Sequence, residues 1–85
     1  MNPLPEYLAI VRGQDGFYIQ GTFEMLKGNK VRKGLVQYWQ AEPVQAWIGR
    51  EFIHCAKRFS SHTEAHEYAN ENADNLDPAM NESVA

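Results

Sequence analysis

Apolar and polar residues alternate with a period of two along the first half of the chain, which is the pattern of half-buried β-strands. A short β-rich run over residues 7–12 is followed by Gly-Gln-Asp-Gly, a sequence typical of a tight turn. The alternation is clearest over residues 17–25, and a third run covers residues 31–39 after a Lys-Gly-Asn-Lys turn. We therefore predict a meander of three antiparallel strands.

A two-residue turn at residues 28–29 would fix the register of the second hairpin. Residues whose numbers add up to 57 would then face each other, so Ile19 would pair with Tyr38 and Tyr18 with Trp39. In this register Ile19 faces the core, and Tyr18 and Trp39 share the opposite face of the sheet. That second face is unusually apolar for a surface in contact with water.

The next part of the chain has a less regular pattern. Over residues 43–49, spacings of three and four between apolar residues indicate a short helix, whereas alternation of Val44, Ala46 and Ile48 indicates a strand. Residues 51–59 alternate more clearly, with Cys55 on the apolar side, and are predicted to form a further strand.

A capping box marks the start of a C-terminal helix. The Ser61 hydroxyl can accept a hydrogen bond from the Glu64 N–H, and the Glu64 carboxylate can reach back to the Ser61 N–H. Small residues then recur at helical spacing in a stripe that can lie close against a sheet. The stripe consists of Ala65, Tyr68, Ala69 and Ala73, with Leu76 just beyond.

The predicted fold class is α+β, a small antiparallel sheet of three to four strands in a meander with a C-terminal α-helix packed on one face. The expected order is β-β-β-(short helix or strand)-β-α. A chain of 85 residues holds one small core, so we expect a single domain over residues 1–77 and a flexible acidic tail over residues 78–85.

Composition places the chain among ordinary globular proteins, with 44% hydrophobic and 22% charged residues. Its longest apolar run is far too short for a membrane span, and its beginning lacks the basic region of a secretory signal. The single cysteine, Cys55, excludes an internal disulfide and fits a reducing compartment. We expect a cytoplasmic protein without membrane contact.

Charge divides the chain sharply at Arg58. Residues 1–58 hold all eight Lys and Arg residues and five acids, a net charge of +3, whereas residues 59–85 hold six acids and no Lys or Arg, a net charge of −6. Polarity of this kind usually concerns partners. The acids expected on the water-facing side of the helix are Glu64, Glu67, Glu71 and Asp74.

The three histidines and the cysteine are the only residues that suggest chemistry, since all four lie between positions 54 and 66. His62 and His66 share a helix face, and either His54 or Cys55 could approach them as a third zinc ligand. Strand alternation prevents His54 and Cys55 from pointing the same way, and a cysteine facing the core is inert. We predict no catalytic residues, no metal site and no cofactor.

The leading hypothesis is a non-enzymatic module that binds another protein, such as a nucleic-acid-handling complex. This size and polarity are compatible with an accessory protein of a phage or mobile element that inhibits or modulates a host complex by occupying a surface. The acidic helix could contact a basic surface, and the second sheet face could form an aromatic interface or a homodimer contact. That face is predicted to comprise Tyr7, Tyr18, Leu35 and Trp39. In the other interpretation, residues 40–50 cover these apolar side chains and the face is not exposed.

The alternative hypothesis is a nucleic-acid-binding domain. Four of the eight basic residues crowd the second hairpin, and basic hairpins beside aromatic residues can neutralise phosphates and stack on bases. The same lysines could instead protect a sheet edge from pairing with another strand. The basic residues in question are Lys27, Lys30, Arg32 and Lys33.

Overall fold

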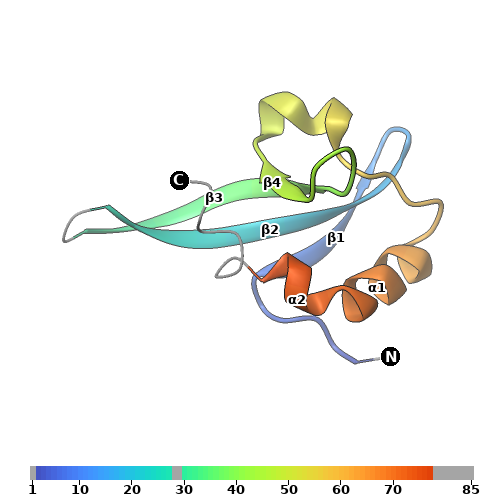
Figure 1. Ribbon diagram of the computed structural model, residues 1–85, viewed down its shortest axis with the longest axis horizontal. Helices are drawn as coiled ribbons and strands as arrows, with labels where there is room; N and C mark the ends of the chain where they lie inside the picture. Colours follow the sequence, from blue (N-terminus) through green and yellow to red (C-terminus); the bar gives the residue numbers. More distant parts are fainter. Residues whose placement is uncertain (1, 28–29, 78–85) are drawn as a thin grey trace.

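The computed structural model describes residues 2–27 and 30–77, and for residues 23–27 and 30–34 it describes the backbone alone. Four strands form one antiparallel sheet in the order β1-β2-β3-β4. The helices α1 and α2 lie on one face of this sheet and the 3₁₀ helix η1 on the other (Figure 1). The elements are β1 (Leu8–Gly13), β2 (Gly16–Lys27), β3 (Lys30–Gln40), β4 (Ala46–Ile48), η1 (Arg50–Cys55), α1 (His62–Glu71) and α2 (Ala73–Leu76).

This architecture confirms the predicted α+β class, with a meander sheet and a C-terminal helix. The expected turn at residues 28–29 and the expected tail at residues 78–85 lie outside the described residues.

The first hairpin has the tight turn that its sequence predicts. Gly13 pairs with Gly16, so residues 14–15 form the connection. Gly16 adopts φ of +142°, a conformation that residues with a side chain rarely take. A Cβ atom at Gly16 would also lie 2.9 Å from the carbonyl oxygen of Phe59, which pairs with Phe17 in an isolated bridge. The glycine therefore permits both the turn and the close approach of the chain that follows η1.

The second hairpin departs from the predicted register through a β-bulge. The predicted rule holds at the far end, where Met25 pairs with Arg32, but Phe23 pairs with Leu35. Two residues of β3 therefore stand opposite one residue of β2 in this interval, as in a bulge. Beyond it the register is shifted by one, and Gln20 rather than Ile19 faces Tyr38. This shift exchanges the faces on which the aromatic residues of β3 lie.

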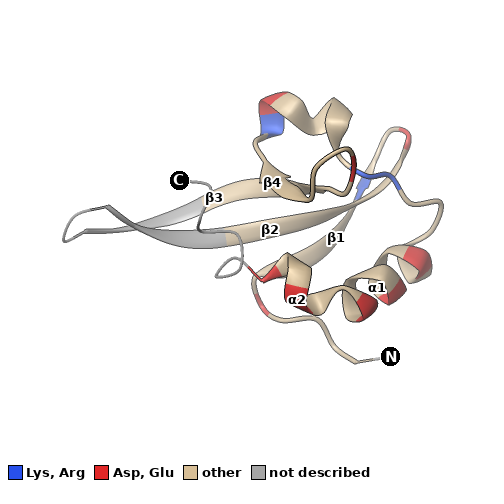
Figure 2. Cartoon of the chain, in the orientation of Figure 1, with Lys and Arg blue, Asp and Glu red and all other residues tan. Residues whose placement is uncertain are grey.

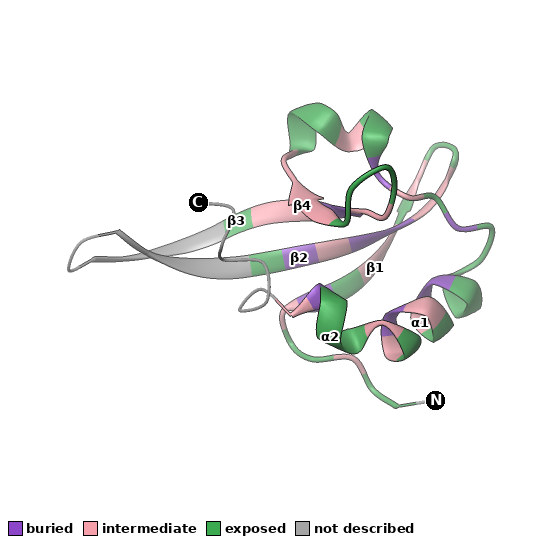
Figure 3. Cartoon of the chain, in the orientation of Figure 1, coloured by how far each residue is buried: buried purple, intermediate pink, exposed green. Residues whose placement is uncertain are grey.

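The larger core lies between the sheet and the helices. Ile19, Trp39 and Leu76 are its largest fully buried side chains. The indole Nε1 of Trp39 donates a hydrogen bond to the Tyr68 hydroxyl at 3.2 Å, which satisfies its one polar atom. The Trp39 ring meets the Trp47 ring edge to face, with centroids 5.2 Å apart. Burial along α1 follows the side turned toward the sheet (Figure 3).

A smaller core occupies the other sheet face, under η1. Tyr18 and Tyr38 are buried there in an edge-to-face contact, with ring centroids 6.2 Å apart. Ala56 is buried beside them, and the half-buried Ile48 and Ile53 complete the cover. The sheet is therefore covered on both faces, although the second layer is thin.

The structure decides between the two alternatives for residues 43–49 and corrects the prediction for residues 51–59. The strand alternative applies at residues 46–48, which form β4. The strand expected at residues 51–59 is wrong, because η1 occupies most of it and only Phe59 bridges to β2. Cys55, expected on a buried strand face, is exposed as a result. The residues after β4 cover Tyr18 and Tyr38. This contact is between distant parts of the chain, so local alternation could not predict it.

The C-terminal helix begins where the capping box predicts. The Ser61 hydroxyl accepts a hydrogen bond from the Glu64 N–H at 3.1 Å, and Ser60 donates a hydrogen bond to the Glu64 carboxylate. Ala65 and Ala69 are buried against the sheet, as expected for the stripe of small residues. Ala73 is exposed instead, because α1 ends at Glu71 and α2 starts a new helical turn.

Candidate partner-binding surfaces

The acidic face of the helices is the first candidate surface. Figure 2 shows acidic residues along α1 and α2, on the layer that covers one side of the sheet. All four predicted residues of this face are exposed, because the buried positions Ala65 and Ala69 orient α1 with its stripe inward. We call the set Glu64, Glu67, Glu71 and Asp74 the acidic face.

These carboxylates are largely unused inside the domain. Glu64 accepts a hydrogen bond from Ser60. In the described part of the chain the one salt bridge joins Arg58 to Asp15, so Glu67, Glu71 and Asp74 form no ion pair there. Their charge is therefore open to water and to any basic surface that approaches.

The predicted aromatic face does not exist as one surface. Trp39 is 1% exposed and lies in the core beneath the helices, whereas Tyr18 is 5% exposed and lies in the core beneath η1. Tyr7 is half-buried against the helix core, and Leu35 is 54% exposed on β3. The bulge is the physical cause, because it places Trp39 and Tyr18 on opposite faces of the sheet.

This burial also excludes one mode of nucleic-acid recognition. Stacking on bases requires an exposed aromatic ring, and Tyr18, Tyr38 and Trp39 are all buried. The expected combination of a basic hairpin with sheet aromatics is therefore wrong in its aromatic half. The four basic residues remain on β2 and β3, where Lys27 and Lys30 are cross-strand partners and Arg32 pairs with Met25.

An unpredicted cluster ties the first turn to the chain after η1. Arg58 Nε donates a hydrogen bond to Asp15 Oδ2 at 2.5 Å, and the Tyr18 hydroxyl donates one to the other carboxylate oxygen. The Arg58 guanidinium also lies over the Tyr18 ring, 5.7 Å from its centroid. Asp15 and Arg58 are 43 positions apart, so no local pattern could have revealed the pair.

Hydrogen bonding within this cluster shifts two titrations in opposite directions. The bond from Tyr18, followed by the contact with Arg58, holds the pKa of the Asp15 carboxyl below its usual 3.8. The same bond raises the pKa of the Tyr18 hydroxyl, because the neutral hydroxyl is the donor. The ionised Asp15 is thus the form that the folded chain favours.

We expect Asp15→Asn to be less stable than the wild type at neutral pH and to lose this difference in acid. Asp15 has a lower pKa in the folded chain than in the unfolded chain. The stabilisation is therefore complete above the unfolded pKa and is lost as the pH falls through the folded pKa. Urea unfolding at about pH 7 and about pH 3 measures the difference in free energy of unfolding between the wild type and the variant.

The matched control for this prediction is Asp74→Asn, which removes an exposed carboxylate of the acidic face instead. Its stability should stay closer to that of the wild type at neutral pH. Equal losses in the two variants at neutral pH would contradict the role given to Asp15.

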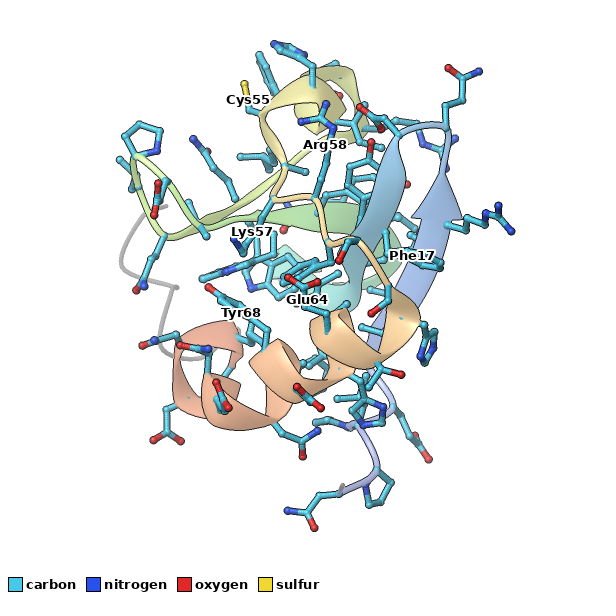
Figure 4. All side chains as sticks on the ribbon, turned by 90° about the vertical axis from the view of Figure 1, so that its right-hand side faces the viewer. Phe17, Cys55, Lys57, Arg58, Glu64 and Tyr68 are labelled. Carbon is cyan, nitrogen blue, oxygen red and sulfur yellow. The ribbon has the colours of Figure 1, made fainter. Side chains whose placement is uncertain are left out.

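Lys57 and Tyr68 lie close together between the sheet and α1 (Figure 4). Lys57 Nζ lies 5.2 Å from the centroid of the Phe59 ring and 5.7 Å from that of Tyr68. Tyr68 in turn accepts the hydrogen bond from Trp39. Two cation–π contacts, one ring–ring contact and one hydrogen bond therefore connect the segment between η1 and α1 to the core.

The four candidate zinc ligands lie on two sides of the sheet. His62 and His66 are on α1, with ring centroids 6.2 Å apart, and His66 Nε2 lies 2.8 Å from the carbonyl oxygen of Asn2. His54 and Cys55 are on η1, across the sheet. Among residues 2–27 and 30–77, no group of three His, Cys, Asp or Glu side chains could hold a metal ion.

An open depression lies beside η1. Its volume is about 200 Å³, below the 300 to 1,000 Å³ usual for small-molecule sites. Cys55 and Lys57 both reach it, but no histidine does. The lining residues are Ala41, Glu42, Cys55, Ala56 and Lys57.

Neither α1, α2 nor η1 has the length and apolar character that a membrane-crossing helix needs, within the residues described.

Comparison with known proteins finds no match to this chain among protein-family models, curated proteins or solved structures.

Proposed function

We propose that this chain is a non-enzymatic protein-binding module that contacts its partner through the acidic face of α1 and α2. The observation that carries the proposal is that Glu67, Glu71 and Asp74 are exposed and form no ion pair within the described residues. Carboxylates placed on a capped and packed helix are presented in a fixed arrangement. They suit a partner surface of opposite charge.

The packing of α1 supports this use of its outer side. Ala65 and Ala69 bring the helix close to the sheet, and the Ser61 cap fixes its first turn. Because α1 is already ordered, binding through its side chains costs less conformational entropy than binding through a flexible segment would. The partner that fits is a protein with a basic surface, including a surface that otherwise binds nucleic acid.

The test compares two variants that each lose three negative charges. The first is Glu67→Gln, Glu71→Gln and Asp74→Asn on the acidic face. The control is Glu6→Gln, Glu42→Gln and Glu51→Gln, three exposed acids outside α1 and α2. Each tagged protein is purified from cells of its own source, and the proteins that copurify are quantified by mass spectrometry.

We expect a basic partner to be recovered with the wild type and the control, and about tenfold less of it with the acidic-face variant. Three exposed ion pairs of ordinary strength account for a loss of this size. Equal recovery with both variants would overturn the proposal, and so would a partner retained only by the acidic-face variant.

A further inference from the structure

β2 and β3 extend beyond the rest of the sheet as a two-stranded ribbon. β1 pairs with β2 as far as Gly21, and β4 pairs with residues 38–40 of β3. Beyond Thr22, whose N–H bonds to Tyr7, the two strands pair only with each other among the described residues. We call residues 23–27 and 30–35 the arm. It runs away from the helices and from η1 (Figure 1).

The arm is the most basic part of the chain. It holds four of the eight Lys and Arg residues and a single acid, so its net charge is +3. Outside the arm and outside residues 59–85, four basic and four acidic residues balance. The overall charge of −3 is therefore the sum of +3 on the arm, −6 on residues 59–85 and zero on the rest of the chain.

This positive charge is unfavourable for the free arm. Lys27 and Lys30 are direct cross-strand partners, and like charges in that relation destabilise a ribbon. A ribbon of two strands has little stability of its own in water. A partner that brings negative charge would relieve the repulsion, which makes a polyanion the class of partner that fits.

We propose that the arm enters the major groove of duplex DNA and that Lys27, Lys30, Arg32 and Lys33 neutralise phosphates along it. The major groove is about 12 Å wide and admits a two-stranded β-ribbon, whose strands lie about 5 Å apart. Lysines along an exposed strand deter the addition of another strand, which argues against a protein strand as the occupant. Burial of Tyr18, Tyr38 and Trp39 argues against a single strand held by stacking on these rings.

The arrangement of charge allows this approach. Acidic residues gather on α1 and α2 (Figure 2), whereas the arm extends away from both helices (Figure 1). DNA can thus meet the arm without lying across the acidic face. The proposal does not depend on the protein partner, because the two surfaces are separate.

Fluorescence anisotropy with a labelled duplex of about 20 base pairs tests the proposal. With four phosphates neutralised, log K should fall with log salt at a slope of about −3.6, a loss of about 100-fold between about 50 and about 200 mM salt. The variant Lys30→Gln/Arg32→Gln should reduce the slope by about 1.8. Duplex RNA of the same sequence should bind more weakly, because its major groove is too narrow for a ribbon.

Arg12→Gln/Arg50→Gln is the matched control, since it also removes two positive charges, from exposed residues outside the arm. It should retain the wild-type slope, and the acidic-face variant should bind DNA at least as well as the wild type. Circular dichroism verifies that each variant is folded. The proposal is overturned if DNA does not bind at about 50 mM salt, if the arm pair and the control pair lose affinity equally, or if duplex RNA binds as tightly as DNA.

Discussion

Trp39→Ala should remove most of the free energy of unfolding of the domain. Trp39 is 1% exposed, donates its Nε1–H to Tyr68 and packs against Trp47, so truncation removes a large buried ring and a satisfied hydrogen bond. Substitutions of this kind cost about 3 to 5 kcal/mol. A domain of 85 residues has a total stability near the lower end of about 5 to 15 kcal/mol. Urea unfolding followed by circular dichroism measures the loss.

Leu35→Ala is the control on the same strand. Leu35 is 54% exposed, and we expect its truncation to change stability by about 0.5 kcal/mol or less. The predicted aromatic face would expose both residues, so this pair of variants separates that prediction from the observed burial of Trp39. A stable Trp39→Ala protein with an unchanged unfolding midpoint would contradict the placement of Trp39 in the core.

The second large effect is expected at the contact between α1 and the sheet. Ala69 is 1% exposed, so Ala69→Leu forces three extra carbon atoms into a packed interface and should cost about 1 to 3 kcal/mol. Thermal unfolding detects this as a lower midpoint. The same change at the exposed Ala73 should leave the midpoint within a degree or two, because its side chain meets water. A larger effect at Ala73 than at Ala69 would contradict the assigned orientation of the helices.

The candidate surfaces were predicted from sequence to different extents. The exposure of the four acids on the acidic face was predicted correctly, because Ser61 and Glu64 mark the helix start and helical periodicity then assigns each acid to a side. The aromatic face was not, since its existence required Tyr18 and Trp39 to share a side of the sheet. The Asp15–Arg58 pair left no trace in local sequence at all.

One residue of register accounts for the aromatic error. Strand alternation assigns neighbours to opposite faces, but the face that each takes depends on every pairing back to the turn. A single bulge between Phe23 and Met25 therefore reverses the assignment of Tyr38 and Trp39. Gly34, inside the predicted strand, was an available signal, because a glycine there often marks a bulge.

Local sequence patterns were sufficient to predict the strands of the first two hairpins, the start of α1, the stripe that packs it and the partition of charge at Arg58. Each of these depends on residues within a few positions of one another, where turn chemistry, capping and periodicity act. Long-range packing instead determines that Trp39 faces the helices, that residues 50–55 form a 3₁₀ helix over Tyr18 and Tyr38, and that Arg58 contacts Asp15. These features depend on which distant segments pack on each face of one small sheet. Local patterns carry no information about that choice.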